Sequence, residues 1–174
     1  MTSADEPAEP SERQRYEAEV AAYVAAGGNE QVQRVVTAVH GLHRRLSQWY
    51  TKQLVDIGLS AGEWAVISHL AAETTDHVST PSQLAEAAAV APSSMTHRLD
   101  KMADRGLIER TPDPTNRTRI LVRLTDEGWQ MFQQVVRESD VVESDVLARV
   151  PERDRERLAK LLELAIAGLD DALR

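Results

Sequence analysis

Apolar residues recur at helical spacing in two long segments of the chain. Between Asn29 and Gly58 they form a continuous stripe, with Asn29 suited to cap the start of a helix and Gly58 suited to end it. After Pro151, leucines and alanines again fall at intervals of three and four residues. The pattern predicts long amphipathic helices in both places.

Two short helices joined by a tight turn are predicted in the middle of the chain. A helix over residues 61–72 follows Ser60, and Pro81 then opens a short helix that ends before Val90. Pro92 can take the first position of the next helix, which runs to Gly106. This spacing is typical of a helix-turn-helix.

The segment after these helices has the pattern of a β-hairpin. Residues 107–110 and 119–124 are strand-like, and the turn-forming sequence TPDPTNRT lies between them. Thr125 can then cap another long helix, which leads to the final helix after Pro151. We therefore predict a hairpin wing directly after the helix-turn-helix.

The order of elements predicts a mainly α fold with a small β-hairpin. Residues 60–125 would form a winged helix-turn-helix lobe of the DNA-binding type, and residues 29–58 and 126–174 a helical dimerisation region. Dimerisation is expected because the long helices carry more apolar surface than a domain of this size can bury. Residues 1–12, rich in Pro, Glu and Ser, are expected to be a disordered acidic terminus, and residues 13–28 an extra N-terminal helix.

Composition excludes several classes of protein. The chain has no cysteine, which excludes disulfides, thiolate metal sites and sensing by thiol oxidation. It has no apolar run long enough to span a bilayer and no secretion signal at its start, so we expect a cytoplasmic protein with no membrane partner. It also lacks phosphate loops, nucleophile elbows and compact carboxylate pairs, so we expect no enzyme, no catalytic residues and no cofactor.

Charge is distributed unevenly along the chain. The formal net charge of −8 argues by itself against a nucleic-acid partner, since phosphate binding needs cations. Between Pro92 and Arg123, however, seven Lys and Arg residues accompany four acids, a local charge of +3 that leaves −11 on the rest. A basic segment in an acidic chain is expected if one face meets DNA, although chance clustering on a solvated surface would give the same count.

The helix that begins at Pro92 has the residues of a DNA reader. Met95, Leu99 and Met102 share one face and are expected to pack inward. The opposite face carries hydroxyls, an imidazole and cations, which can contact base edges and phosphates in a major groove. The predicted contact residues are Ser93, Ser94, Thr96, His97, Arg98 and Lys101. An ordinary solvated helix would show the same two faces.

The hairpin favours the DNA-reading interpretation. Arginines at or beside its tip can enter a minor groove, where the negative potential is concentrated. The predicted wing contacts are Asp113, Asn116, Arg117 and Arg119. Asp113 could pair with a wing arginine and hold the loop, or simply start the turn. The alternative function is a protein-binding scaffold of the same fold. Such a scaffold would not need these cations together.

From residue 30 onward, the chain resembles the MarR family of bacterial transcription regulators, most sharply over residues 83–128. That family's wing has a turn resembling DPxDRR, followed by a strand and LTxxG. The matching residues are Asp113, Pro114, Arg117, Leu124, Thr125 and Gly128. Asn116 stands for the usual Asp and Thr118 for the second Arg, and Arg119 can supply the missing charge.

The resemblance implies a homodimer that presents two recognition helices and two wings to a palindromic operator in double-stranded DNA. It also implies a repressor that a small anionic or aromatic effector relieves. The extra N-terminal helix and the run MTHRLD are similar to the urate-responsive PecS-like branch, whose ligand site uses a Trp of the extra helix, an Asp and two arginines. Arg98 and Arg110 match the arginines, but Ala65 replaces the Asp and the extra helix has Tyr16 and Tyr23 without a Trp. Urate is therefore not singled out as the ligand.

A ligand pocket is predicted from aromatic and polar residues on three helices. Its candidate residues are His43, Ser47, Tyr50, Trp64, Trp129 and Phe132. Such a set suits a flat aromatic acid, although the same aromatics could serve only as core. His40 and His43 could share a metal with His69 or His77 in a metal-responsive regulator, but no cysteine or ordered carboxylate completes the set and we expect no metal site.

Overall fold

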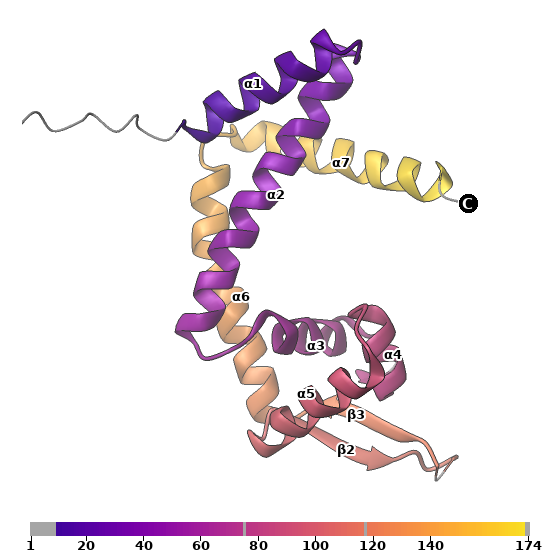
Figure 1. Ribbon diagram of the computed structural model, residues 1–174. Coiled ribbons are helices and arrows are strands. Elements are labelled where there is room, and N and C mark those ends of the chain that lie inside the picture. The colour runs from indigo at the N-terminus through magenta and orange to yellow at the C-terminus, as the bar shows by residue number, and fades with distance from the viewer. Residues whose placement is uncertain (1–9, 75, 117, 173–174) are drawn as a thin grey trace, which may run out of the picture. The chain divides into compact units, whose positions relative to one another are not determined.

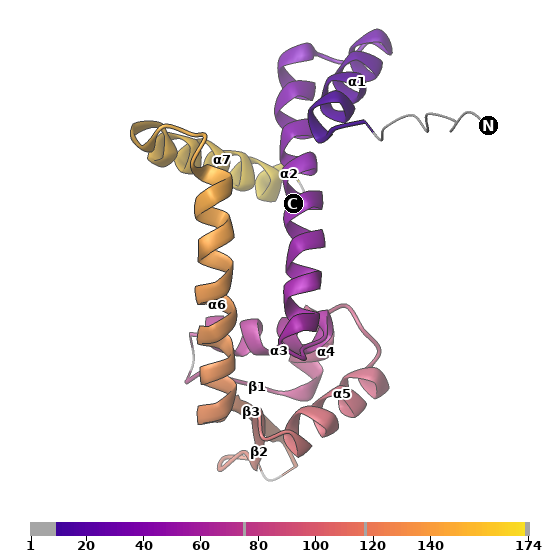
Figure 2. The same ribbon diagram turned by 90° about the vertical axis from the view of Figure 1, so that its left-hand side faces the viewer.

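The computed structural model of the protein describes residues 10–74, 76–116 and 118–172 (Figure 1). The chain divides into two compact units, residues 1–60 and residues 61–174. The first unit is a helical hairpin, and the second contains the described strands and the remaining helices, which can be followed from two sides (Figure 1, Figure 2).

The first unit pairs a short helix with a long one. α1 (Glu12–Ala25) and α2 (Glu30–Asp56) are joined through Gly27, whose φ of 97° lies in the region that favours glycine. The side chain of Asn29 accepts a hydrogen bond from the N–H of Val32, 3.1 Å away, in the first turn of α2. Both helices therefore lie where the pattern of apolar residues and caps indicates.

The start of α1 corrects one expectation. Disorder was expected over residues 1–12, of which residues 1–9 lie outside the described residues, whereas Ser11 and Glu12 belong to the ordered start of the helix. Ser11 forms a capping box with Gln14, and the carboxylate of Glu12 lies 3.2 Å from Nη2 of Arg44 in α2. These bonds order residues 11 and 12 and tie α1 to α2.

The second unit contains a helix-turn-helix. Its helices are α3 (Ala61–Ala72), α4 (Pro81–Ala87), α5 (Pro92–Asp104), α6 (Asp126–Leu147) and α7 (Glu152–Ala172). Pro81 and Pro92 each stand at the first position of a helix, where a missing N–H costs no intrahelical hydrogen bond. α4 and α5, with the short turn between them, form the predicted pair.

A three-stranded antiparallel sheet completes this unit. β2 (Ile108–Pro112) and β3 (Ile120–Leu124) form the predicted hairpin, with Ile108 paired to Leu124 at its base. A third strand, β1 (Val78–Ser79), pairs with β3, which gives the order β1-β3-β2. The sequence analysis did not predict this strand, because a strand of two residues has no period of its own and depends on its partner.

The core of the second unit joins the helices to the sheet. Its most deeply buried side chains are at most 1% exposed and include Ile67, Leu70, Leu84, Met95, Leu99, Met102 and Val122. Three of these side chains belong to α5. Burial of each contributes roughly 1.5–3 kcal/mol, so α5 cannot rotate or slide without opening the core.

Thr125 joins the base of the hairpin to α6. Its hydroxyl accepts a hydrogen bond from the N–H of Gly128, 3.0 Å away, and donates one to the carbonyl of Gly106, 2.5 Å away. A Cβ at Gly128 would collide with the carbonyl oxygen of Leu107. The LTxxG motif thus has a physical basis: Leu124 is buried, Thr125 caps α6, and Gly128 allows close approach to the backbone.

The described residues are mainly helical with one small antiparallel sheet, which confirms the predicted fold class. None of their helices is both long and apolar enough to cross a membrane. Large apolar side chains nevertheless lie exposed on α7, namely Leu158, Leu161, Leu164, Ile166 and Leu169.

Candidate nucleic-acid interface

α5 presents two faces of opposite character. Met95, Leu99 and Met102 are fully buried, as their spacing predicted. Five of the six predicted contact residues on this helix are exposed to solvent, namely Ser93, Ser94, Thr96, His97 and Lys101. Hydroxyls, an imidazole and an ammonium together supply donors and acceptors of the kind that contact base edges and phosphates.

The sixth predicted residue, Arg98, lies differently. Its side chain is partly buried, and its guanidinium lies over Gly62 in the first turn of α3. No hydrogen bond or ion pair joins that guanidinium to another residue of the described part of the chain. The sequence placed Arg98 on the open face with its neighbours, because the position of α3 against α5 cannot be read from spacing within α5.

Several other arginines of the basic segment are paired within the unit. The ion pairs are Arg105 with Glu63 at 2.6 Å, Arg110 with Asp100 at 2.8 Å, and Arg123 with Glu109 at 2.6 Å. Sequence reasoning missed them. Only the pair of Arg123 with Glu109 could have been predicted from the sequence, because these residues of opposite charge are partners in the hairpin register. Arg98 and Lys101 stand outside these pairs.

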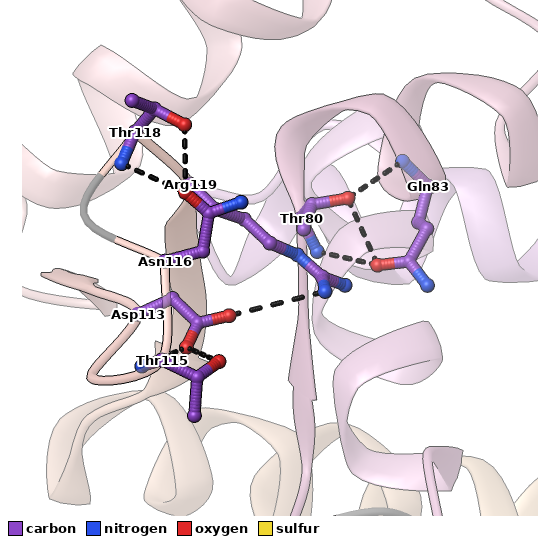
Figure 3. Close-up of polar contacts among 7 residues, drawn as sticks. All are labelled: Thr80, Gln83, Asp113, Thr115, Asn116, Thr118 and Arg119. Atoms are coloured by element: carbon purple, nitrogen blue, oxygen red, sulfur yellow. Dashed lines mark hydrogen bonds and ion pairs between the residues drawn. The ribbon is translucent and has the colours of Figure 1, made fainter.

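The tip of the hairpin is organised by Asp113 (Figure 3). Its buried carboxylate accepts hydrogen bonds from the N–H and the hydroxyl of Thr115, at 2.7 and 2.6 Å. Its other oxygen lies 3.8 Å from Nη1 of Arg119, and its backbone N–H donates to the Arg119 carbonyl, 2.9 Å away. Asp113 therefore both starts the turn and pairs with a wing arginine.

A second polar side chain repeats this arrangement within the loop. Oδ1 of Asn116 accepts hydrogen bonds from the N–H and the hydroxyl of Thr118, at 3.2 and 2.7 Å (Figure 3). The two residues that depart from the family's turn thus bond to each other. The Arg119 side chain is 50% exposed and available to a partner. Arg117, the fourth predicted wing contact, lies outside the described residues.

Hydrogen bonds from Thr115 hold the pKa of Asp113 below its ordinary value, and the positive charge of Arg119 adds to the shift. Asp113 is therefore ionised at neutral pH. The charged carboxylate is the form that accepts the hydrogen bonds of Thr115 and pairs with Arg119, so the conformation of the turn depends on that charge.

The predicted ligand-pocket residues are divided between the two units. His43, Ser47 and Tyr50 lie on α2, with His43 exposed and the other two partly buried. In the second unit, the ring of Phe132 stacks on Trp64, with centroids 5.7 Å apart, and meets Trp129 edge-on at 5.9 Å. These are the contacts of packed aromatics, and a ligand role for them stays a prediction.

Trp129 also lines a polar cavity of about 570 Å³ in the second unit. Its ring lies edge-on to His77, with centroids 5.2 Å apart. The charged residues of the lining are Asp76, Glu109, Arg123, Asp126 and Glu127. Four carboxylates against one guanidinium do not suit an anionic ligand. Within the described ranges, no three His, Asp or Glu side chains gather as ligands for a metal ion.

The buried and exposed faces of α5, the helix before it and the hairpin after it define the second unit as a winged helix-turn-helix. A model of the MarR family matches residues 57–117, which include that helix pair and most of the hairpin turn. The transcriptional regulator PecS of Dickeya dadantii is 32% identical over 104 residues, which cover 60% of this chain and 63% of PecS. Residues 57–117 thus match the MarR family, as the motifs predicted, and the chain spans slightly less than two thirds of the length of PecS.

Solved structures share the fold. The transcriptional regulator PA4135 is 26% identical with a TM-score of 0.61, over 78% of this chain and 95% of that one. A MepR variant from S. aureus, bound to an oligodeoxyribonucleotide, has a TM-score of 0.58 at 17% identity, over 78% of this chain and 97% of MepR. At that identity the likeness to MepR concerns the fold alone.

Proposed function

We propose that the protein is a sequence-specific DNA-binding transcriptional regulator that acts as a homodimer. The observation that carries the proposal is the exposed polar face of α5 together with a hairpin whose turn starts at the hydrogen-bonded Asp113. Both elements pack on one buried core. The names of its relatives support it, since PecS is a transcriptional regulator and the MepR variant holds an oligodeoxyribonucleotide. Among the described residues, we find no arrangement that favours catalysis.

In the proposed complex, α5 enters a major groove and the wing lies in an adjacent minor groove. Ser93 and Ser94 stand in the first turn of α5, where free N–H groups and the helix dipole favour a phosphate. His97 and Lys101 follow on the exposed face and reach base edges or the backbone. Arg119 projects from the anchored tip of the hairpin toward the minor groove.

Homodimerisation is proposed from exposed apolar faces. Val35 of α2, in the first unit, is 58% exposed. In the second unit, Leu161 and Leu169 share one side of α7 and are 55% and 59% exposed. Apolar side chains exposed in this way on either unit are typical of a surface that another protein chain covers. A symmetric dimer would present two α5 helices to a palindromic site, with half-sites about 34–36 Å apart.

We further propose that the protein is a cytoplasmic repressor and that a small aromatic or anionic effector releases it from DNA. This part of the proposal rests on what the resemblance of residues 83–128 to the MarR family implies. The aromatic row of Trp64, Phe132 and Trp129 is the place where a flat ligand would have most ring surface to contact.

Selection from a randomised duplex library tests the proposed function. The protein is incubated with the library in the presence of excess non-specific DNA, and the retained duplexes are sequenced. We expect enrichment of one motif made of two inverted half-sites one helical turn apart. Retention of no DNA at low salt would contradict the proposal and favour a protein-binding scaffold.

A further inference from the structure

Gly62 and Arg98 meet where α3 packs near α5. The three heavy atoms nearest to a Cβ built on Gly62 all belong to the Arg98 guanidinium group, with Cζ at 2.5 Å, Nη2 at 2.6 Å and Nε at 2.8 Å. Cβ atoms in proteins essentially never approach another heavy atom within 3.0 Å. Any residue other than glycine at this position would therefore displace the guanidinium.

The backbone on both sides of this contact is held in place. Leu99, next to Arg98 in α5, and Ile67 in α3 are both fully buried. Glu63, which follows Gly62, forms an ion pair of 2.6 Å with Arg105 and makes a second link between the two helices. Of the groups in contact, only the flexible end of Arg98 is free to move.

Space, and not a polar partner, determines where this guanidinium lies. No residue of the described ranges forms a hydrogen bond or ion pair with it. It lies at the N-terminal turn of α3, where the positive end of the helix dipole disfavours a cation. The N–H donors of Arg98 are thus unused toward these residues, and a guanine edge or a phosphate would bind them.

We propose that Gly62 is a positioning residue for sequence recognition, an inference that rests on the proposed DNA-binding function. In the free protein, Gly62 leaves a resting place in which the Arg98 guanidinium lies against α3. On the correct sequence, the guanidinium turns outward to a base edge. A side chain at position 62 would fill the space that the guanidinium occupies in the free protein. Arg98 would then be extended both in the free protein and on DNA, and it would pair with phosphates of any sequence.

The test is the substitution Gly62→Ala, measured by fluorescence anisotropy on two duplexes. One duplex carries the sequence selected from the random library and the other a shuffled sequence of the same composition. The ratio of the two affinities is expected to fall about tenfold, through tighter binding to the shuffled duplex, which corresponds to the loss of one arginine–base discrimination. The thermal midpoint should stay the same or rise, because alanine is a better helix former than glycine.

Arg98 supplies the decisive control. In the Arg98→Ala background, Gly62→Ala should have no further effect on the affinity ratio, because the group that it displaces is gone. Gly168→Ala, in α7, places its Cβ in open space and should leave the ratio unchanged. A structural role for Gly62 alone would lower the thermal midpoint and would not depend on Arg98.

Three results would overturn the proposal. The affinity ratio could be unchanged in Gly62→Ala, or it could change equally with and without Arg98. Either result would exclude the positioning role of Gly62 and leave the proposed function intact. A wild-type protein that binds the two duplexes equally would overturn the proposed function itself, and the positioning role with it.

Discussion

Asp113 and Arg119 face each other across the turn of the β2–β3 hairpin, with Oδ2 of the carboxylate 3.8 Å from Nη1 of the guanidinium. Two hydrogen bonds from Thr115 fix the same carboxylate. The wing therefore offers an exposed arginine that is partly held by Asp113, and a side chain that is already held in position loses less conformational entropy when it binds.

The charge of Asp113 is expected to stabilise the wing and hence the second unit. Its pKa is lowered in the folded protein, so its stabilising contribution is present above the ordinary pKa of an aspartate and is lost as pH falls through the folded value. Asp113→Asn should lower the thermal midpoint at neutral pH, and the difference from wild type should narrow in acid. Asp104→Asn, an exposed change on α5, should show no such pattern in the same melting series.

Gly128 is expected to be essential for the junction between the hairpin and α6. A Cβ there meets the backbone carbonyl of Leu107, which cannot move aside as a flexible side chain would. Gly128→Ala should cost about 1–3 kcal/mol of unfolding free energy, the usual range for overpacking. Urea unfolding followed by circular dichroism measures it. Gly168→Ala has open space and should be neutral or stabilising by up to about 1 kcal/mol, and equal losses in both variants would refute the account of this junction.

Lys101 is expected to contact DNA phosphate or a base edge from the exposed face of α5. Lys101→Gln should weaken binding and reduce the slope of log affinity against log salt by about 1. Lys160→Gln is the matched control, since Lys160 lies on α7 and pairs with Glu156 at 2.7 Å. If both substitutions change the slope equally, the loss of any lysine weakens DNA binding and the proposed contact of Lys101 with DNA is refuted.

The apolar face of α7 is expected to be covered in a homodimer. Leu169→Glu should shift the sedimentation coefficient from that of two chains to that of one, because an unpaired carboxylate would be buried in the interface. Lys160→Ala, an exposed change on the opposite side of the same helix, should leave the assembly intact. A wild-type protein that sediments as a single chain at micromolar concentration would contradict the dimer.

Local signals in the sequence predicted the helices well. Asn29 and Thr125 cap the helices that they were expected to cap, and Pro81 and Pro92 start theirs, because each effect involves neighbours a few residues apart. The strand-like residues 119–124 likewise placed β3 within one residue of its observed start. These are features that chain-local chemistry determines.

Contacts between distant segments were not predictable in the same way. β1 needed its partner β3, and the resting place of Arg98 needed the approach of Gly62 from another helix. The pairing of Arg105 with Glu63 joins residues 42 positions apart, which no spacing rule covers. The candidate site was therefore predicted as a set of residues on one helix and one loop. The structure adds which charged side chains of this region already form ion pairs within the protein.

The most direct test of the central claim is fluorescence anisotropy with the intergenic DNA upstream of the protein's own coding sequence, titrated against salt and excess non-specific DNA. The account predicts a discrete complex that resists the competitor and whose affinity falls steeply with salt, despite the net charge of −8. The absence of any complex at low salt, on this DNA and on the selected duplex, would contradict it.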